Sequence, residues 1–268
     1  MKVLDRHALP PVLLLHGMCC TGSSLQALRT TLARLGLRVE APSLGGAARG
    51  AGTQAPYGLD DLFAEAIARA EALRTANGFP PVVVGHSNGG LLALALAARG
   101  LATAAVLVAP APVPSVGGAP AWLRRLIARR MFGRGWQDRW VELSPGTSGL
   151  LPPALAGTLA ADSGHAMSDV LHACRKGPFD PAPALACPLA IVSGGKDRMV
   201  PAFLSRRMAK RFGARLDVLP KADHWLIWDR QAIDRIALIV GGFVGAAASA
   251  SARDSRASGQ NVCPDTLS

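Results

Sequence analysis

The most constraining feature of the sequence is a serine set among glycines, GHSNGG at residues 85–90, between the apolar runs PVVV (81–84) and LLALALAA (91–98). A serine in this position suits neither a buried strand nor an apolar helix. It suits a very sharp strand-to-helix turn, in which Gly85 and Gly89 avoid collisions with the neighbouring strand and helix. Such a turn holds the Ser87 hydroxyl at its tip, beside a helix N-terminus whose free N–H groups favour negative charge.

Short apolar runs alternate with helical patterns along most of the chain. Their nearly continuous hydrophobicity is typical of strands buried on both faces, as in a parallel sheet. Residues 59–78 have apolar positions at helical spacing, acids in the first turn and Asn77–Gly78 at the end, which predicts a helix. The pattern predicts a doubly wound α/β fold with a mainly parallel six-stranded sheet and helices on both faces. The six expected strands are PVLLL (11–15), LRVEA (37–41), PVVVG (81–85), AAVLVA (104–109), PLAIVS (188–193) and ARLDVL (214–219).

Two regions break this alternation. Residues 111–185 have no clear strand and many prolines and glycines, so we expect a helical cap inserted between two parts of one core, 1–110 and 186–247. Residues 248–268 are small and polar and are expected to form a disordered tail.

The segment PAWLRRLIARRMF (120–132) predicts a cap helix with an apolar face and arginines opposite it. The expected apolar face consists of Trp122, Leu123, Leu126, Ile127 and Met131, and the arginines are Arg124, Arg125 and Arg129. The favoured interpretation is that the apolar face packs on the core and the arginines are solvated. The alternative is an interfacial helix that contacts anionic membranes or acyl substrates.

Composition limits the class of protein. A chain of 268 residues that is 50% hydrophobic can bury one large core. Its net charge of +11 is spread along the chain and no nucleic-acid-binding motif is present, so a nucleic acid is not an expected partner. The five cysteines have neither disulfide-framework nor metal-site spacing. The start of the chain lacks a signal-peptide pattern, and charges or glycines interrupt the apolar runs 91–109 and 231–249. A reduced, cytoplasmic protein is therefore expected.

A serine hydroxyl becomes a good nucleophile only beside a base, which an acid must orient. The loop GGKDRMVP (194–201) places Asp197 after one expected strand, and KADHWL (221–226) places His224 after the next. The carboxyl ends of parallel strands meet at one edge of the sheet, which is also the edge where Ser87 is expected. The alternatives weighed are Asp223 and Asp229 for the acid and His16, His86, His165 and His172 for the base.

Four motifs together resemble the α/β-hydrolase superfamily: HGM (16–18), GHSNGG (85–90), GGKDRMVP (194–201) and ADHW (222–225). The resemblance covers most of residues 9–245, although the insertion does not match and few residues precede the first strand. It implies a triad of Ser87, Asp197 and His224. It also implies an oxyanion hole formed by the backbone N–H groups of Met18 and Asn88, which meets the chemical need for two preorganised donors.

The resemblance implies a hydrolase of carboxylic esters, or of thioesters, that works through an acyl-enzyme on a small-molecule substrate without metal or organic cofactor. A cofactor-free lyase, a perhydrolase, an acyltransferase and a ligand-binding module with negligible turnover remain alternatives. Trp225 and Trp228 either line an apolar acyl pocket or anchor the last helix. Cys19 and Cys20 are expected to be small apolar lining of the oxyanion loop.

Overall fold

The six-stranded sheet predicted from the sequence is confirmed. The computed structural model describes residues 9–45, 57–118, 120–143, 151–152, 155, 158–172 and 178–259. All neighbouring strands of the sheet are parallel, in the order β2-β1-β3-β4-β7-β8. Each strand lies within its predicted run or extends one residue beyond it. The strands are β1 (Val12–Leu15), β2 (Val39–Glu40), β3 (Val82–His86), β4 (Ala104–Val108), β7 (Leu189–Gly194) and β8 (Arg215–Leu219).

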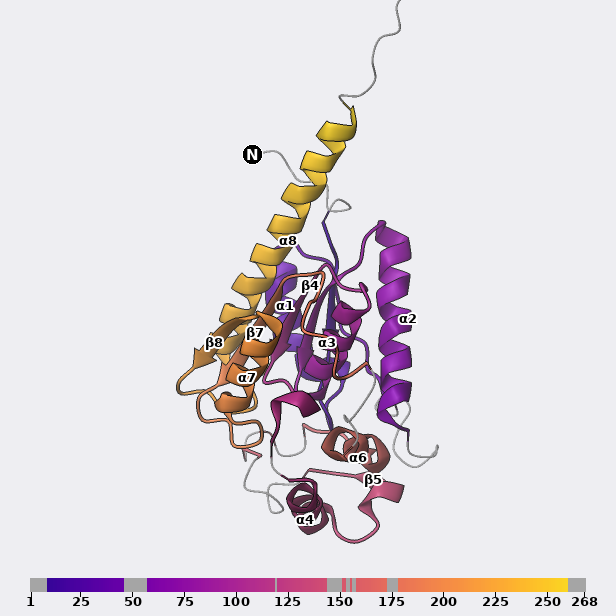
Figure 1. The fold of residues 1–268 in the computed structure, drawn as a ribbon, viewed down its shortest axis with the longest axis vertical. Helices are drawn as coiled ribbons and strands as arrows, with labels where there is room; N and C mark the ends of the chain where they lie inside the picture. Colours follow the sequence, from indigo (N-terminus) through magenta and orange to yellow (C-terminus); the bar gives the residue numbers. More distant parts are fainter. Residues whose placement is uncertain are drawn as a thin grey trace, which may run out of the picture.

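Helices cover both faces of this sheet, as expected (Figure 1). One hydrophobic cluster joins the sheet to α2 (Leu59–Asn77), α3 (Asn88–Ala98) and α7 (Ala202–Phe212). A second cluster, on the opposite face, joins it to α1 (Gln26–Arg34) and α8 (Arg230–Gly259). Successive side chains of β1 point to opposite faces of the sheet and so contribute to both clusters, since Leu13 belongs to the first and Leu14 to the second. The near-continuous apolar runs therefore reflect strands that are buried on both sides.

The predicted insertion leaves the sheet after β4 and returns to it at β7. Its elements lie together at the lower end of the molecule in Figure 1. They include a short antiparallel pair of strands, β5 and β6, where the sequence suggested none. Two residues per strand are too few to give an alternating pattern. The cap elements are η4 (Pro114–Val116), α4 (Ala121–Phe132), η5 (Trp136–Asp138), β5 (Trp140–Val141), β6 (Asp162–Ser163) and α6 (Gly164–His172).

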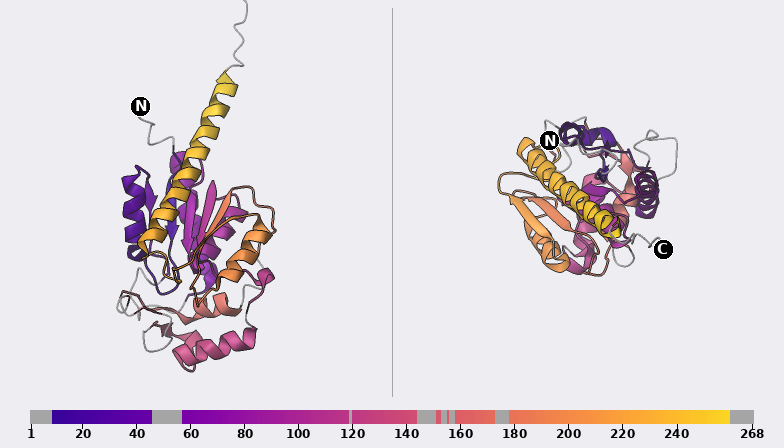
Figure 2. Two further views of the ribbon diagram at one scale, coloured as in Figure 1. Left: turned by 90° about the vertical axis from the view of Figure 1, so that its left-hand side faces the viewer. Right: turned by 90° about the horizontal axis from the view of Figure 1, so that it is seen from above.

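The expected packing of α4 is wrong for three of its five residues. Ala128 and Phe132 are its buried residues, and they form a small core with Trp136 and Val141. Of the five residues expected to pack, Leu123 and Met131 are half-buried and Met131 contacts this small core, whereas three are exposed: Trp122 by 67%, Leu126 by 43% and Ile127 by 47%. These three residues are named the α4 apolar face. The exposed α4 arginines beside it are Arg125, Arg129 and Arg130. Helix α4 lies across the end of the molecule opposite to the free end of α8 (Figure 2).

The expected disordered tail is also wrong over residues 248–259, because α8 continues to Gly259. Alanine is the strongest helix former and no proline interrupts this stretch, so its polar composition does not end the helix. A helix of 30 residues is about 45 Å long, more than twice the length of the strands, and it projects beyond the sheet (Figure 1). Residues 260–268 of the expected tail lie outside the described residues.

By length and composition alone, Arg230–Ala250 of α8 is able to cross a membrane. In the fold, 39% of its apolar window is buried. The buried part includes Ile233, Ile236 and Val240, which belong to the second hydrophobic cluster against the sheet, whereas Leu238 is 65% exposed.

Candidate active site

The serine motif forms a sharp turn between β3 and α3. Ser87 has φ 53° and ψ −115°, a strained backbone for a residue with a side chain. The flanking glycines make the turn sterically feasible. A Cβ on Gly85 would lie 1.9 Å from the carbonyl oxygen of Gly89, and one on Gly89 would lie 2.2 Å from the carbonyl oxygen of Leu15. The turn thus sets the half-buried Ser87 at the N-terminus of α3, as predicted.

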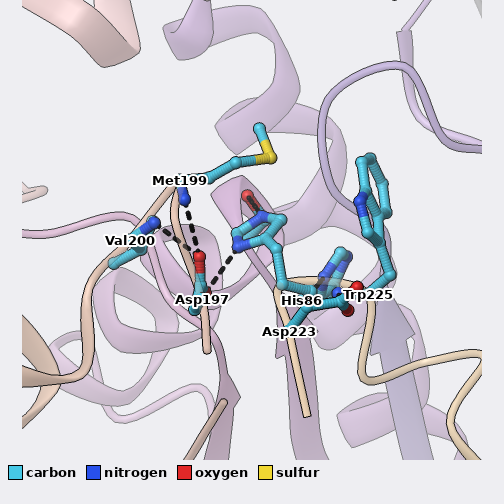
Figure 3. Close-up of polar contacts among 8 residues, drawn as sticks. His86, Asp197, Met199, Val200, Asp223 and Trp225 are labelled. Atoms are coloured by element: carbon cyan, nitrogen blue, oxygen red, sulfur yellow. Dashed lines mark hydrogen bonds and ion pairs between the residues drawn. The ribbon is translucent and has the colours of Figure 1, made fainter. Parts of the chain in front are cut away.

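The structure brings the three predicted triad residues together in one hydrogen-bonded chain. The Ser87 hydroxyl donates to Nε2 of His224 at 3.0 Å, and Nδ1–H of His224 donates to Oδ2 of Asp197 at 2.8 Å. The second carboxylate oxygen, Oδ1, accepts the backbone N–H groups of Met199 and Val200 at 2.8 and 2.7 Å (Figure 3). His224 and Asp197 are both buried. The carboxylate therefore fixes the imidazole with its unprotonated Nε2 toward the serine.

Each alternative acid has another role in the structure. The Asp223 carboxylate accepts the backbone N–H of Trp225, and the Asp229 carboxylate accepts that of Ala232 at the start of α8. Both contacts are short local turns of the kind that aspartate commonly makes.

Two of the alternative bases, His16 and His165, have other contacts in the structure. His16 donates from Nδ1 to the carbonyl of Gly17 and accepts the N–H of Leu44 at Nε2, so it is a structural residue. His165 pairs with Asp169 on the exposed side of α6. The side chain of His172 lies outside the described residues.

His86 points away from Ser87 and contacts the backbone of His224, the candidate base. Its Nε2–H donates to the carbonyl oxygen of His224 at 3.0 Å. Its ring also lies near the rings of His224 and Trp225, with centroids 5.2 and 6.2 Å away. Burial is the main cause that lowers the pKa of His86 to about 3, and repulsion from His224 adds to it. The ring is therefore neutral at physiological pH, as its single donated hydrogen bond requires.

Met18 lies in a tight turn next to the serine. The N–H of Cys20 donates to the carbonyl of Gly17, which places Met18 and Cys19 in the middle of the turn. A Cβ on Gly17 would come within 3.0 Å of Ser87 Cβ, so the turn packs directly against the candidate nucleophile. The side-chain amide of Asn88 donates to the sulfur of Met18 at 3.5 Å. The two residues expected to supply the oxyanion hole are therefore neighbours in space.

Neither expected N–H donor has an acceptor within the described parts of the chain. The N–H of Asn88 is at the first position of α3, where helix geometry leaves it unpaired. Two free N–H groups beside a serine are what a developing negative charge requires.

A buried carboxylate that was not predicted from the sequence lies next to this turn. Asp162 of β6 accepts the N–H of Cys19 at 2.6 Å and the hydroxyl of Tyr57. Burial raises the pKa of Asp162, and burial together with this carboxylate raises that of Tyr57. No local pattern signals the contact, because 143 residues separate Asp162 from Cys19.

The remaining predicted residues are placed as follows. Cys19 and Cys20 are buried, and burial raises the pKa of the Cys20 thiol to about 12 and that of Cys19 well above its usual range. Both thiols therefore stay protonated at neutral pH.

Trp225 is buried against the His224 ring and against Trp228, and its role in substrate binding stays a prediction. Among the described residues, no cluster of three potential metal ligands is found.

Comparisons with known proteins agree with this architecture. The model of the alpha/beta hydrolase family matches residues 12–237. The chain therefore belongs to the alpha/beta hydrolase family. No curated protein matches the sequence.

Several solved structures share the fold at low sequence identity. A monoacylglycerol lipase from Paleococcus ferrophilus superposes with a TM-score of 0.64 at 20% identity, over 88% of this chain and 96% of the other. A thermophilic esterase from Thermogutta terrifontis gives 0.62 at 20% identity, over 89% and 90%. A thioesterase domain from the curacin biosynthetic pathway gives 0.62 at 18% identity, over 87% and 92%. At these identities the likeness establishes the fold, and the chain is a hydrolase by family.

Proposed function

We propose that the protein hydrolyses carboxylic esters through an acyl-enzyme on Ser87. The observation that carries this proposal is the hydrogen-bonded chain from Ser87 through His224 to Asp197. It lies at the edge of the sheet where the backbone N–H groups of Met18 and Asn88 have no acceptor among the residues that the structure describes. Neither the fold alone nor the serine motif alone would support it as well, because nucleophilic catalysis needs all three groups in contact.

The reaction begins when Oγ of Ser87 attacks the ester carbonyl carbon and its proton passes to Nε2 of His224. Asp197 stabilises the resulting imidazolium through Nδ1–H, and the N–H groups of Met18 and Asn88 donate to the oxyanion. As the tetrahedral intermediate collapses, His224 returns the proton to the departing alcohol. A water molecule then loses a proton to His224 and attacks the acyl-enzyme, which releases the acid and restores Ser87. A thioester would react in the same way with a thiol as the leaving group.

The test is steady-state hydrolysis of p-nitrophenyl esters of increasing acyl length, with an acyl thioester in parallel. We expect at least one ester to give a kcat of roughly 1 s⁻¹ or more, an ordinary enzymatic value. Ser87→Ala should abolish the activity, and His224→Ala should be nearly as inactive. Ser249→Ala, which removes an exposed serine hydroxyl from α8, is the matched control and should retain the full rate. A folded wild type that turns over no ester or thioester would refute the proposal and favour a ligand-binding role.

A further inference from the structure

The turn that carries Met18 has a backbone conformation that needs support. Cys19 is the third residue of this turn and has φ 58°. A positive φ at the third position is normally taken by glycine, because a Cβ crowds the neighbouring carbonyl. A non-glycine residue keeps this conformation only where its surroundings determine it.

The support comes from the cap. Oδ2 of Asp162 accepts the Cys19 N–H at 2.6 Å, and the N–H of Ala160 donates to the Cys19 carbonyl at 2.9 Å. One short cap segment therefore binds both polar backbone groups of the strained residue. Cap and turn are separated by most of the chain, so this contact exists only when the cap is docked.

Asp162 is itself held in place. It is buried, and its Oδ1 accepts the Tyr57 hydroxyl and the backbone N–H of Ser163, the latter at 2.7 Å. The Tyr57 ring packs edge-on against Trp140 of β5, with centroids 5.7 Å apart. The carboxylate is thus a fixed acceptor for Cys19.

We propose that Asp162 is a positioning residue, which holds the Gly17–Cys20 turn so that the Met18 N–H is available to the oxyanion, and so makes the oxyanion hole dependent on the docked cap. The inference rests on the proposed function, since it concerns the same site. A merely structural role would be to fasten the cap. The turn lies within contact distance of Ser87, so a change in its backbone displaces a donor at the reacting centre.

The test combines Asp162→Ala with Cys19→Gly, because glycine adopts a positive φ without support. Asp162→Ala should lower kcat for a good ester by up to about 10²-fold, comparable to the loss of one oxyanion donor, with little change in KM. Cys19→Gly alone should be close to wild type. In the double variant at least tenfold of the lost kcat should return. Asp162→Asn, whose amide oxygen can still accept the Cys19 N–H while its NH2 group faces the Ser163 N–H, should retain more of the rate than Asp162→Ala.

A second cap carboxylate provides the matched control. Asp169 of α6 accepts the N–H of Leu59 at 2.9 Å and so fastens the cap to α2. Asp169→Ala should lower the melting temperature with kcat nearly unchanged, and Cys19→Gly should not alter its effect. If the kcat losses of Asp162→Ala and Cys19→Gly simply multiply, or if Asp162→Ala raises KM alone, Asp162 only fastens the cap and the proposal is wrong.

Amide hydrogen exchange separates this proposal from the proposed function, because it needs no substrate. Peptides covering residues 17–20 should exchange faster in Asp162→Ala than in wild type or Asp162→Asn, and unchanged exchange would overturn the proposal. If Asp162→Ala does not fold, Tyr57→Phe removes one hydrogen bond from the carboxylate and takes its place in both experiments. A wild type without ester turnover would refute the proposed function and leave the exchange result to decide on the turn.

Discussion

The buried His86 should make the protein sensitive to mild acid. Its pKa is about 3 in the folded chain, whereas a histidine in an unfolded chain has a pKa near 6.5. Between these two values the unfolded state binds a proton that the native state does not. Stability from this residue is therefore complete above pH 6.5 and is lost as the pH falls toward 3. One pKa unit corresponds to about 1.4 kcal/mol, so lowering the pH from 7.5 to 5 should remove about 2 kcal/mol of unfolding free energy.

The perturbation that isolates this effect is His86→Gln. The glutamine amide can donate to the His224 carbonyl in place of Nε2–H, but it does not titrate. Urea unfolding of wild type and variant at pH 7.5, 6.5 and 5.0 gives the free energy of unfolding at each pH. We expect the decrease from pH 7.5 to 5.0 to be about 2 kcal/mol smaller in the variant. His16, whose pKa burial also lowers, contributes to the decrease in both proteins.

His165→Gln, which removes an exposed imidazole from α6, is the matched control and should keep the pH dependence of the wild type. A change in unfolding free energy by His86→Gln that is the same at all three pH values would refute this prediction. Such a result would mean that burial does not lower the pKa of His86 in the folded protein.

Two further predictions concern the ends of the molecule. The α4 apolar face lies among arginines with no acidic residue in the helix, so the protein should co-sediment with anionic vesicles at low salt. Reversing the charge of the three exposed α4 arginines, Arg125, Arg129 and Arg130, should release the protein, whereas reversing Arg34 and Arg74, at the opposite edge of the sheet, should not. Failure of the wild type to pellet would contradict this prediction. Removing residues 249–268 should shift the melting temperature by no more than a few degrees, because Val244 is the last buried apolar residue found in α8. A larger loss, measured by differential scanning fluorimetry, would show that the end of α8 packs on the fold.

Local sequence patterns predicted the sheet and the hydrogen-bonded chain because each depends on short-range signals. A continuous apolar run marks a buried strand, and in a parallel fold the residues after such runs meet at one edge. Ser87, Asp197 and His224 each follow a run of this kind. The glycines around Ser87 and before Asp197 were informative for the same reason. A Cβ on Gly194 would lie 2.2 Å from the carbonyl oxygen of Asp223, so glycine is required where these loops pass each other.

The features that were not predicted depend on contacts across the chain. Asp162 gains its role only from the distant Cys19 and Tyr57, and the spacing of residues along β6 gives no sign of them. Helix α4 was located correctly, but its amphipathic pattern fits either a packed or an exposed apolar face. The side of α4 that is buried is the one that carries Phe132, which packs on Trp136 with ring centroids 5.7 Å apart. For α8, low hydrophobicity indicated disorder, whereas the helix propensity of alanine favoured continuation of the helix.

The most direct test of the central claim is covalent labelling with a fluorophosphonate, which reacts with activated serines. Mass spectrometry of the labelled and digested protein should find one adduct, on Ser87. Ser87→Ala should carry none, and His224→Ala should react far more slowly, because the base that accepts the serine proton is missing. An adduct on a different residue, or a rate of labelling at Ser87 that is unchanged in His224→Ala, would contradict the claim that the chain from Asp197 through His224 activates this serine.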